Sequence, residues 1–550
     1  MQIDMKAGFI KWLIENVVAR RPGADGARAT VLLIVISTAL RLVLAACVPP
    51  LGDEAYHWHL GTRFHLSYDH PPLTYWLAAI GYHLAPGGNF LFPRLPFVLM
   101  FGGSTWLVFL VTRLAFGDRA GFRAALLFSS APFFLVGAGV AALPEGPLTF
   151  SWLLCLWALI RIFFDPEPTR PMLRWLGLGL ALGLAFLSKY HAVFIPLGVG
   201  LFVMAAPAAR RRVSGAGLLL ALAAAAVVSL PIIVWNCEHG GMSFATFLRR
   251  GLTVRGVHPE DAVKNVAGQA LFLMPWIWAF LVGCLAWGLA PCRRPPAARF
   301  LSLMAVGPLA LFTAASAVNG EWYQFHWPLV GYVSLFPLAG AVLADEGERI
   351  AVWSRRFAVF CATAMVAVAG GILLYAATPW SGALSARVPI LAPSRFVARN
   401  YDLSGFAGLA EALRRRDLLA RPNLFVCAGN YMDSGRLAWV LRGRLPVLCV
   451  ARWEEAKGYV FLTEASGWRG ADALLVSRDL DVASDLALAR PFFSGVTSAG
   501  SVTVGRGAHQ TTLHLNLLEG MSRPLPSSAA AARPTRDLPY QSLSGNPVWP

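Results

Sequence analysis

Apolar segments, most of them near the ~20 residues that a membrane-spanning helix needs, recur along the first two thirds of this chain. No other feature of the sequence constrains the fold as strongly. Eleven segments of roughly that kind lie near 30–48, 95–115, 122–141, 147–164, 174–188, 190–206, 216–235, 269–290, 299–317, 328–344 and 357–378. The sequence therefore predicts a polytopic α-helical membrane protein with about 11 transmembrane helices.

The composition supports this class and excludes others. Of the 550 residues, 56% are hydrophobic and only 14% are charged, whereas about a quarter of the residues of a soluble protein are charged. This excludes a soluble enzyme, a disordered chain and a nucleic-acid-binding domain. The 8 cysteines form neither a metal-binding spacing nor a dense disulfide framework. The first apolar segment is too long and too late for a cleavable signal peptide, so a retained anchor is expected.

The net charge of +17 is explained by topology. With the N-terminus in the cytoplasm, the predicted cytoplasmic loops hold 20 basic residues and the opposite loops hold 7. This asymmetry is typical of the positive-inside rule. No nucleic-acid partner is needed to explain the basic excess, and the lipid bilayer is the expected surrounding.

Composition divides the chain into four parts. After the last predicted span the charges return, and short strand-like runs alternate with polar helical stretches, which favours a small extracytoplasmic α/β domain. The final residues are rich in Pro, Ser, Ala and Arg, and a disordered tail is expected there. The predicted parts are a cytoplasmic N-terminal segment at 1–29, a transmembrane domain at 30–378, a periplasmic α/β domain at 379–519 and a disordered tail at 520–550.

Two cysteines, Cys427 and Cys449, lie on predicted strands of the α/β domain. In an oxidising compartment they form either a disulfide or two buried thiols on neighbouring strands. The sequence leaves both open. Arg41 lies within the first span, where it either snorkels outward or faces the bundle and pairs with an acid.

Ionisable and aromatic residues gather in the loops predicted to face outward. These loops lie at 49–94, 142–147, 188–191, 236–268 and 318–327. Ionisable groups at the membrane edge are costly unless they are paired or functional, so an active site opening to the outer face is predicted. For any single carboxylate the alternative is solvated surface, and the Trp and Tyr residues fit an interfacial belt.

Two positions stand out in these loops. Asp53 and Glu54 directly follow the first span and open an amphipathic stretch, and Lys189 sits in a short turn between two apolar segments. A long ammonium there either reaches a ligand at headgroup depth or serves as a snorkelling anchor.

Ordered motifs in the chain resemble a known superfamily. They are DEAYHW after the first span, YDHPPLTYWL, FPRLPFVL, GLALGLAFLSKY, PIIVWNCEHGGMSF, HWP and YDLSGFAGLAEAL, and together they cover most of residues 30–480. The set resembles the GT-C membrane glycosyltransferases, which include the protein O-mannosyltransferases and the aminoarabinose–lipid A transferases. Glu145 in LPEGP stands where many relatives carry Asp. His70 precedes the double proline where the aminoarabinose enzymes tend to have Lys, which resembles the other bacterial branch.

The resemblance implies sugar transfer from a polyprenyl-phosphate donor to an acceptor at the outer face of the bacterial inner membrane. The acceptor hydroxyl belongs to lipid A or another glycolipid, to a glycan or to a protein, and the sequence does not choose among them. Inverting transfer needs a carboxylate base, for which Asp53 is the candidate. It also needs cations at the leaving phosphate, for which Lys189 and Arg94 are candidates, with Arg249 and Arg250 behind them.

The remaining outer-loop residues are assigned to the acceptor or to a divalent ion. This set comprises Glu54, Asp69, Glu145, Glu238, His239 and His326. No cofactor is required, because Lys and Arg neutralise a monophosphate, although the carboxylates allow a divalent metal. A transporter or flippase for a lipid-linked sugar is the main alternative. It is disfavoured because transporters place ionisable groups near the membrane midplane. The third possible function is that of a membrane-anchored binding protein that acts through the α/β domain.

Overall fold

The computed structural model describes the chain from Gly26 to Leu525 with several gaps. The described residues are 26–62, 69–87, 89–167, 169–252, 254, 256–291, 294–319, 325–344, 348–378, 404–462, 468–506, 509–523 and 525. The chain forms two compact units, Met1–Leu403 and Ser404–Pro550. We call the first the membrane unit and the second the sheet unit.

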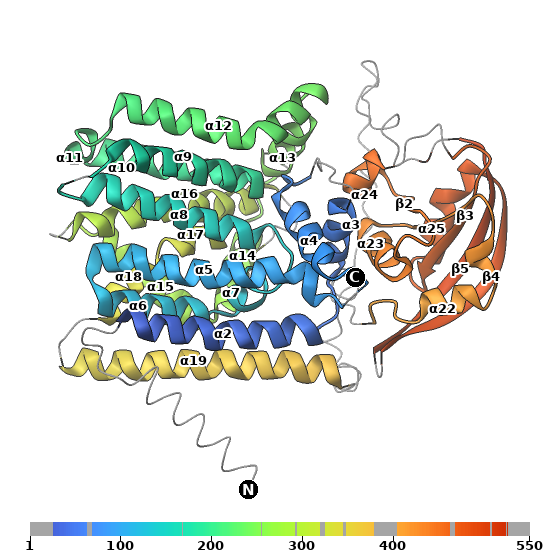
Figure 1. Cartoon of the computed structure of the whole chain (residues 1–550), viewed down its shortest axis with the longest axis horizontal. Helices are drawn as coiled ribbons and strands as arrows, with labels where there is room; N and C mark the ends of the chain where they lie inside the picture. Colours follow the sequence, from blue (N-terminus) through green and yellow to red (C-terminus); the bar gives the residue numbers. More distant parts are fainter. Residues whose placement is uncertain are drawn as a thin grey trace, which may run out of the picture. The chain divides into compact units, whose positions relative to one another are not determined.

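The membrane unit is helical throughout its described part (Figure 1). Its helices are α2 (Gly26–Cys47), α3 (Gly52–Gly61), α4 (Leu73–Leu84), α5 (Leu91–Phe116), α6 (Asp118–Ser130), α7 (Pro132–Val136), α8 (Glu145–Phe164), α9 (Pro171–Ser188), η2 (Tyr190–Val193), α10 (Phe194–Ala205), α11 (Pro207–Arg210), α12 (Gly215–Glu238), α13 (Met242–Leu252), α14 (Pro259–Leu273), α15 (Pro275–Leu289), α16 (Pro296–Asn319), α17 (Leu329–Val333), α18 (Phe336–Leu343) and α19 (Glu348–Ala377). Long helices lie side by side, and α3 and α4 lie at one end of the bundle (Figure 1).

Seven described helices are long and apolar enough to cross a membrane, or eight if α14 and α15 count as one bent span. The chain is therefore a multi-pass membrane protein, but the predicted count of eleven is not confirmed. The difference lies in broken segments. The span predicted at 122–141 is interrupted at Ala131, whose backbone is extended because it precedes Pro132. The segment predicted at 269–290 bends by 109° before Pro275, and the segments at 190–206 and 328–344 form shorter helices.

Buried apolar side chains from α5, α6, α8, α9 and the helices around them form the core of the membrane unit. Arg41 of α2 is fully buried in it, so it faces the bundle and does not snorkel. Its guanidinium donates to the carbonyls of Ser37 at 3.1 Å and Phe134 at 3.4 Å and lies 4.0 Å from the ring centroid of Phe101. These contacts hold Arg41 in the bundle. No acidic partner of Arg41 is found among the described residues.

The sheet unit is an α/β fold, as predicted. Its elements are α22 (Leu409–Arg414), η4 (Leu418–Ala420), β1 (Leu424–Ala428), α23 (Tyr431–Leu441), β2 (Val447–Cys449), α24 (Trp453–Ala456), η5 (Lys457–Phe461), β3 (Asp472–Arg478), α25 (Val482–Ala489), η6 (Arg490–Phe492), β4 (Phe493–Arg506) and β5 (His509–Met521). The strand order is β2-β1-β3-β5-β4, with β1 parallel to β2 and β3 and with β5 antiparallel to β3 and β4. Strand β5 continues past residue 519, because Met521 still pairs with Phe493 and its side chain is buried in the core of the sheet unit.

The register of β1 and β2 decides between the two predicted states of the cysteines. Cys427 lies opposite Leu448, and Ala428 lies opposite Cys449. Because successive side chains point to opposite faces of a sheet, Cys427 and Cys449 lie on different faces. Both are buried free thiols.

Candidate active site

Helix α3 carries the first cluster of predicted site residues. It begins directly after Leu51, and Glu54 in its first turn accepts a hydrogen bond from the Leu51 N–H at 2.9 Å. Asp53 and Glu54 both lie in this first turn, where the helix N-terminus favours negative charge. Glu54 is fully buried and Asp53 partly so. The two carboxylates, although adjacent in the sequence, therefore lie in different surroundings: that of Glu54 is buried and that of Asp53 is partly exposed.

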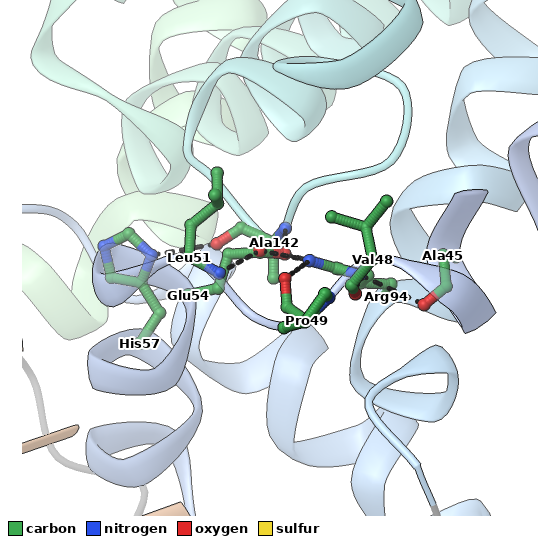
Figure 2. A network of polar contacts seen from close by, with 8 residues as sticks. All are labelled: Ala45, Val48, Pro49, Leu51, Glu54, His57, Arg94 and Ala142. Carbon is green, nitrogen blue, oxygen red and sulfur yellow. Dashed lines mark hydrogen bonds and ion pairs between the residues drawn. The ribbon is translucent and has the colours of Figure 1, made fainter. Parts of the chain in front are cut away.

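Glu54 forms a buried ion pair with Arg94 at the start of α5 (Figure 2). The Arg94 Nε donates to Glu54 Oε1 at 2.8 Å and Nη2 donates to Oε2 at 2.5 Å. The remaining guanidinium donors bind the carbonyls of Ala45 at 3.0 Å, Val48 at 2.6 Å and Pro49 at 3.1 Å. All five N–H groups of the guanidinium are thus engaged.

This saturation argues against two predictions. Arg94 has no N–H donor left for a donor phosphate. Glu54 accepts from Leu51, Ala142 and twice from Arg94, so its two oxygens use the roughly four acceptor sites of a carboxylate. In this arrangement neither side chain has a hydrogen-bonding group left for a substrate, and their predicted binding roles stay predictions. Together they tie the end of α2, the start of α3 and the start of α5.

The same helix fixes the loop that precedes α8. The Ala142 N–H donates to Glu54 Oε1 at 2.8 Å, and the Ala142 carbonyl lies 2.8 Å from His57 Nδ1 (Figure 2). Residues 54 and 57 are one helical turn apart, so side chains from the same face of α3 contact both the N–H and the carbonyl of Ala142. The loop leads directly into Glu145, whose position is thereby set.

Glu145, Lys189 and His326 meet at a small pocket. Lys189 Nζ donates to Glu145 Oε1 at 2.5 Å, and His326 Nε2 lies 3.3 Å from the same oxygen. The pocket is small and partly open. Besides these three residues it is lined by Phe133, Phe134, Leu148, Thr149, His191, Trp327 and Val330.

Lys189 does not snorkel, because its side chain is only 5% exposed and pairs with Glu145 inside the unit. An ammonium has three N–H donors, and the contact with Glu145 uses one. The pair is therefore only partly saturated, in contrast to Glu54 and Arg94. Lys189 can therefore offer two N–H donors and a positive charge to a ligand in the pocket.

Asp53 and His70 act electrostatically on this cluster. Burial lowers the pKa of His326 to about 4; Glu145 and Asp53 act to raise it, and Lys189 acts to lower it. His70 acts on both Glu145 and His191. His326 is therefore a neutral imidazole near pH 7, and the predicted base lies in the field of the same pocket.

Asp69 is buried beside two tyrosines rather than in the pocket lining. Its Oδ1 accepts hydrogen bonds from Tyr56 at 2.9 Å and from Tyr75 at 3.1 Å. Through Asp69 these contacts link α3 to α4. Asp69 therefore helps to position α3 relative to α4 beside the candidate site.

Glu238 and His239 lie at the end of α12 and do not line the pocket described above. Glu238 is exposed, and His239 stacks on Trp235 with ring centroids 4.3 Å apart. Arg249 and Arg250 have side chains outside the described residues. Within the described part of the chain, one group of three His or acidic residues has ligand atoms mutually within 4.8 Å, namely His258, Glu260 and Asp261 at the start of α14. It contains none of the predicted metal-assisting residues.

His191 is the pocket residue that sequence reasoning did not assign. It is 2% exposed, and neither ring nitrogen finds a hydrogen-bond partner among the described residues. Its ring packs against Phe247, Phe312 and Trp327, with centroids 4.6 to 5.9 Å away. Its position two residues after Lys189, in the same short outer turn, was the available signal.

Comparisons with known proteins agree with this architecture. A family model described as dolichyl-phosphate-mannose-protein mannosyltransferase matches residues 69–235. The crystal structures of ArnT from Cupriavidus metallidurans, bound to undecaprenyl phosphate and in the apo state, superpose with TM-scores of 0.53 and 0.55. They are 15% and 16% identical to this chain, cover 90% and 89% of it, and are themselves covered to 98%. The chain shares the fold of these ArnT structures.

Curated relatives of this chain are named as transferases. The undecaprenyl phosphate-alpha-4-amino-4-deoxy-L-arabinose arabinosyl transferase of Pseudomonas aeruginosa strain UCBPP-PA14 is 31% identical over 278 residues, 48% of either chain. A second such transferase, from Pseudomonas fluorescens, is 28% identical over 84% of this chain and 80% of its own length. The lipid A galacturonosyltransferase RgtD of Rhizobium johnstonii is 26% identical over 53% of this chain and 59% of its own. The chain thus spans about half the length of the P. aeruginosa relative.

Proposed function

We propose that this protein transfers a sugar from a polyprenyl-phosphate donor to a hydroxyl of lipid A or the lipopolysaccharide core at the periplasmic face of the inner membrane. The names of the relatives support both the donor class and the acceptor class. The basic residues of the predicted cytoplasmic loops support the orientation, with the N-terminus in the cytoplasm and the sheet unit in the periplasm.

The observation that carries this proposal is the partly saturated ion pair in the pocket. Lys189 is buried, paired with Glu145 and still able to donate two hydrogen bonds. A cation held in a low-dielectric site stabilises a developing phosphate charge more strongly than one in water. Such a site suits the leaving group of a lipid-phosphate sugar.

The proposed roles follow from the surroundings of each group. Asp53 takes the proton of the acceptor hydroxyl, because it is a partly exposed carboxylate in the field of the pocket. Lys189 neutralises the leaving phosphate, and Glu145 orients Lys189. His326, whose Nε2 lies 3.3 Å from Glu145 Oε1, helps to keep that carboxylate in place. Because Lys189 supplies the positive charge, we propose that turnover needs no divalent metal.

The transporter alternative receives no support. The relatives named above are transferases. The ionisable pocket residues come from the connections at one end of the bundle, namely the loop before α8, the turn after α9 and the segment before α17. Transporters place such groups near the bilayer midplane on broken helices.

The purified full-length protein tests the proposal directly. It is incubated with undecaprenyl-phosphate sugars and with lipid A or core oligosaccharide, and release of undecaprenyl phosphate is measured by mass spectrometry with and without EDTA. Acceptor-dependent release, unchanged by EDTA, is expected for at least one donor. Release that never depends on a lipid A or core acceptor, across neutral, amino and uronic acid donors, contradicts the proposal.

Lys189→Met sharpens the test, because it keeps the length and apolar packing of the stem while removing the charge. Donor affinity and turnover should both fall, and Lys189→Arg should restore them only in part because a planar fork replaces a compact ammonium. Lys264→Met is the matched control, since Lys264 pairs with Asp261 at an exposed position away from the pocket. Normal donor binding and turnover in Lys189→Met would remove the assignment.

A further inference from the structure

A second group of basic side chains lies at the end of the membrane unit opposite the candidate active site. Gly26, the first residue of α2, packs against Asp118 at the start of α6, whereas the last residue, Cys47, leads into α3. A helix of 22 residues is about 33 Å long, so the two ends are separated by roughly a bilayer. Figure 1 shows α6 and α3 at opposite ends of the bundle. We call Arg119 and Arg123 of α6 with Arg355 of α19 the arginine cluster.

Arg123 is the buried member of the arginine cluster. It is 5% exposed, and its Nε and Nη1 find no hydrogen-bond acceptor in the described part of the chain. Of the charged groups in the described part of the chain, Arg119 and Arg355 act on it, and both have the same sign as Arg123. Nearby Arg113 differs, because it pairs with Asp118 at 2.8 Å.

Such an arrangement is unfavourable unless an anion lies there. Burying an unpaired charge is strongly unfavourable, and two neighbouring like charges make it more so. A guanidinium offers five N–H donors in a fork that matches the oxygens of a phosphate. On α19, Ser354 precedes Arg355, and its buried hydroxyl likewise has no partner among the described residues. The unmet hydrogen-bonding capacity therefore suits an anion with several acceptor oxygens.

The surroundings of the arginine cluster favour a lipid as the source of that anion. The same end of α19 presents Val352, Trp353 and Phe360 as exposed apolar side chains, each 47% to 51% exposed. A phospholipid offers acyl chains to these residues and a phosphate to the arginines at the boundary between them. Under the proposed orientation this end faces the cytoplasmic leaflet, which is rich in anionic lipids.

We propose that the arginine cluster binds the phosphodiester of an anionic phospholipid and that this lipid completes the packing of α6 against α19. This site is separate from the donor pocket and does not depend on the proposed transfer reaction. Its occupant is part of the folded membrane unit, so its removal should lower stability before it changes chemistry.

The test uses the full-length protein in phosphatidylcholine nanodiscs with and without phosphatidylglycerol. Phosphatidylglycerol should raise the unfolding temperature of the wild type, and native mass spectrometry should find one retained phosphatidylglycerol. Arg123→Gln should lose the retained lipid, with an apparent affinity about tenfold lower, as expected for losing a charge-assisted hydrogen-bonding partner. Arg113→Gln, a basic residue at the same end that already has its own partner, should behave as the wild type.

Three outcomes overturn the proposal. One is an equal effect of phosphatidylglycerol on the wild type and on Arg123→Gln. Another is equal protection by inorganic phosphate in detergent, which would assign the site to a free anion. The third is retention of phosphatidylglycerol by a variant in which Asp345, Glu346 and Glu348 are neutralised but not by the wild type, which would make the chain's own carboxylates the partner. If Arg123→Gln does not fold, Arg119→Gln with Arg355→Gln leaves the buried residue intact and should weaken lipid retention in the same direction.

Discussion

Two buried ion pairs in the membrane unit differ in how completely they are satisfied. Arg94 and Glu54 use every donor and acceptor they have, on each other and on backbone groups. Lys189 and Glu145 share one hydrogen bond and line a pocket. A saturated pair has nothing to offer a ligand, whereas a partly saturated pair keeps charge and hydrogen-bonding capacity for one. Saturation therefore separates the structural pair from the functional candidate.

The two pairs are also connected through the backbone. Glu54 and His57 hold Ala142, and Glu145 follows three residues later at the start of α8. The structural pair therefore fixes the carboxylate that orients Lys189. A substitution in the Glu54–Arg94 pair should therefore displace Glu145 and so disturb its contact with Lys189. A substitution in the Glu145–Lys189 pair should leave the Glu54–Arg94 pair intact.

Removing Arg94 should have the largest effect on the protein. Arg94→Gln leaves Glu54 buried without its cation, and breaking a buried pair in this way costs about 3–5 kcal/mol. We expect a large fall in unfolding temperature in detergent and little folded protein in the membrane. Arg113→Gln breaks an exposed pair with Asp118, worth about 0–1 kcal/mol, and is the matched control. A folded Arg94→Gln variant that has lost only donor affinity would restore Arg94 as a phosphate ligand.

Replacing the proposed base should affect chemistry and spare stability. Asp53→Asn keeps the size of the side chain and removes its charge. General-base assistance contributes about 10²–10⁴-fold, so turnover should fall by at least the lower bound. Loss of a charge at the N-terminus of α3 should lower stability by only about 0.3–1 kcal/mol. Near-normal turnover in Asp53→Asn would exclude Asp53, whereas Asp118→Asn at the far end of the bundle should leave turnover unchanged.

These contrasts also explain what the sequence can and cannot predict. Loop position alone placed Asp53, Glu145, Lys189 and His326 at one end of the bundle, because each borders an apolar segment. It could not separate Glu54 from Asp53, since both follow the same span and only the contact with Arg94 distinguishes them. Likewise, the apolar run at 122–141 looks like one span, and its break depends on the local effect of Pro132.

His191 offers a prediction in which stability and activity move in opposite directions. His191→Phe keeps a ring against Phe312 and Trp327 but removes two buried nitrogens that lack partners. An unsatisfied buried polar group costs about 1–3 kcal/mol, so the variant should be at least as stable as the wild type. If those nitrogens bind the donor, its affinity should fall about tenfold, the usual effect of losing one hydrogen bond. A stabilised variant with unchanged donor affinity would make His191 a packing residue.

The smallest expected effect concerns the pH dependence of stability at His326. Its pKa is lowered to about 4 in the folded protein, whereas an unfolded histidine titrates near 6.5. Because the folded pKa lies below the unfolded one, the contribution of the neutral ring is complete above about pH 6.5 and is lost as the pH falls towards 4. Between pH 7 and pH 5.5 this loss amounts to about 1 kcal/mol. His326→Gln keeps a polar side chain beside Glu145 and does not titrate. The unfolding free energy of the wild type should therefore fall relative to that of the variant by about that amount over the same interval. His514→Gln in the sheet unit, where the histidine contacts Asp479 at a more exposed position, tests whether the change is specific to the pocket. A difference that stays constant from pH 7 to pH 5.5 would mean that the ring at the pocket is solvated and is not held neutral beside Glu145.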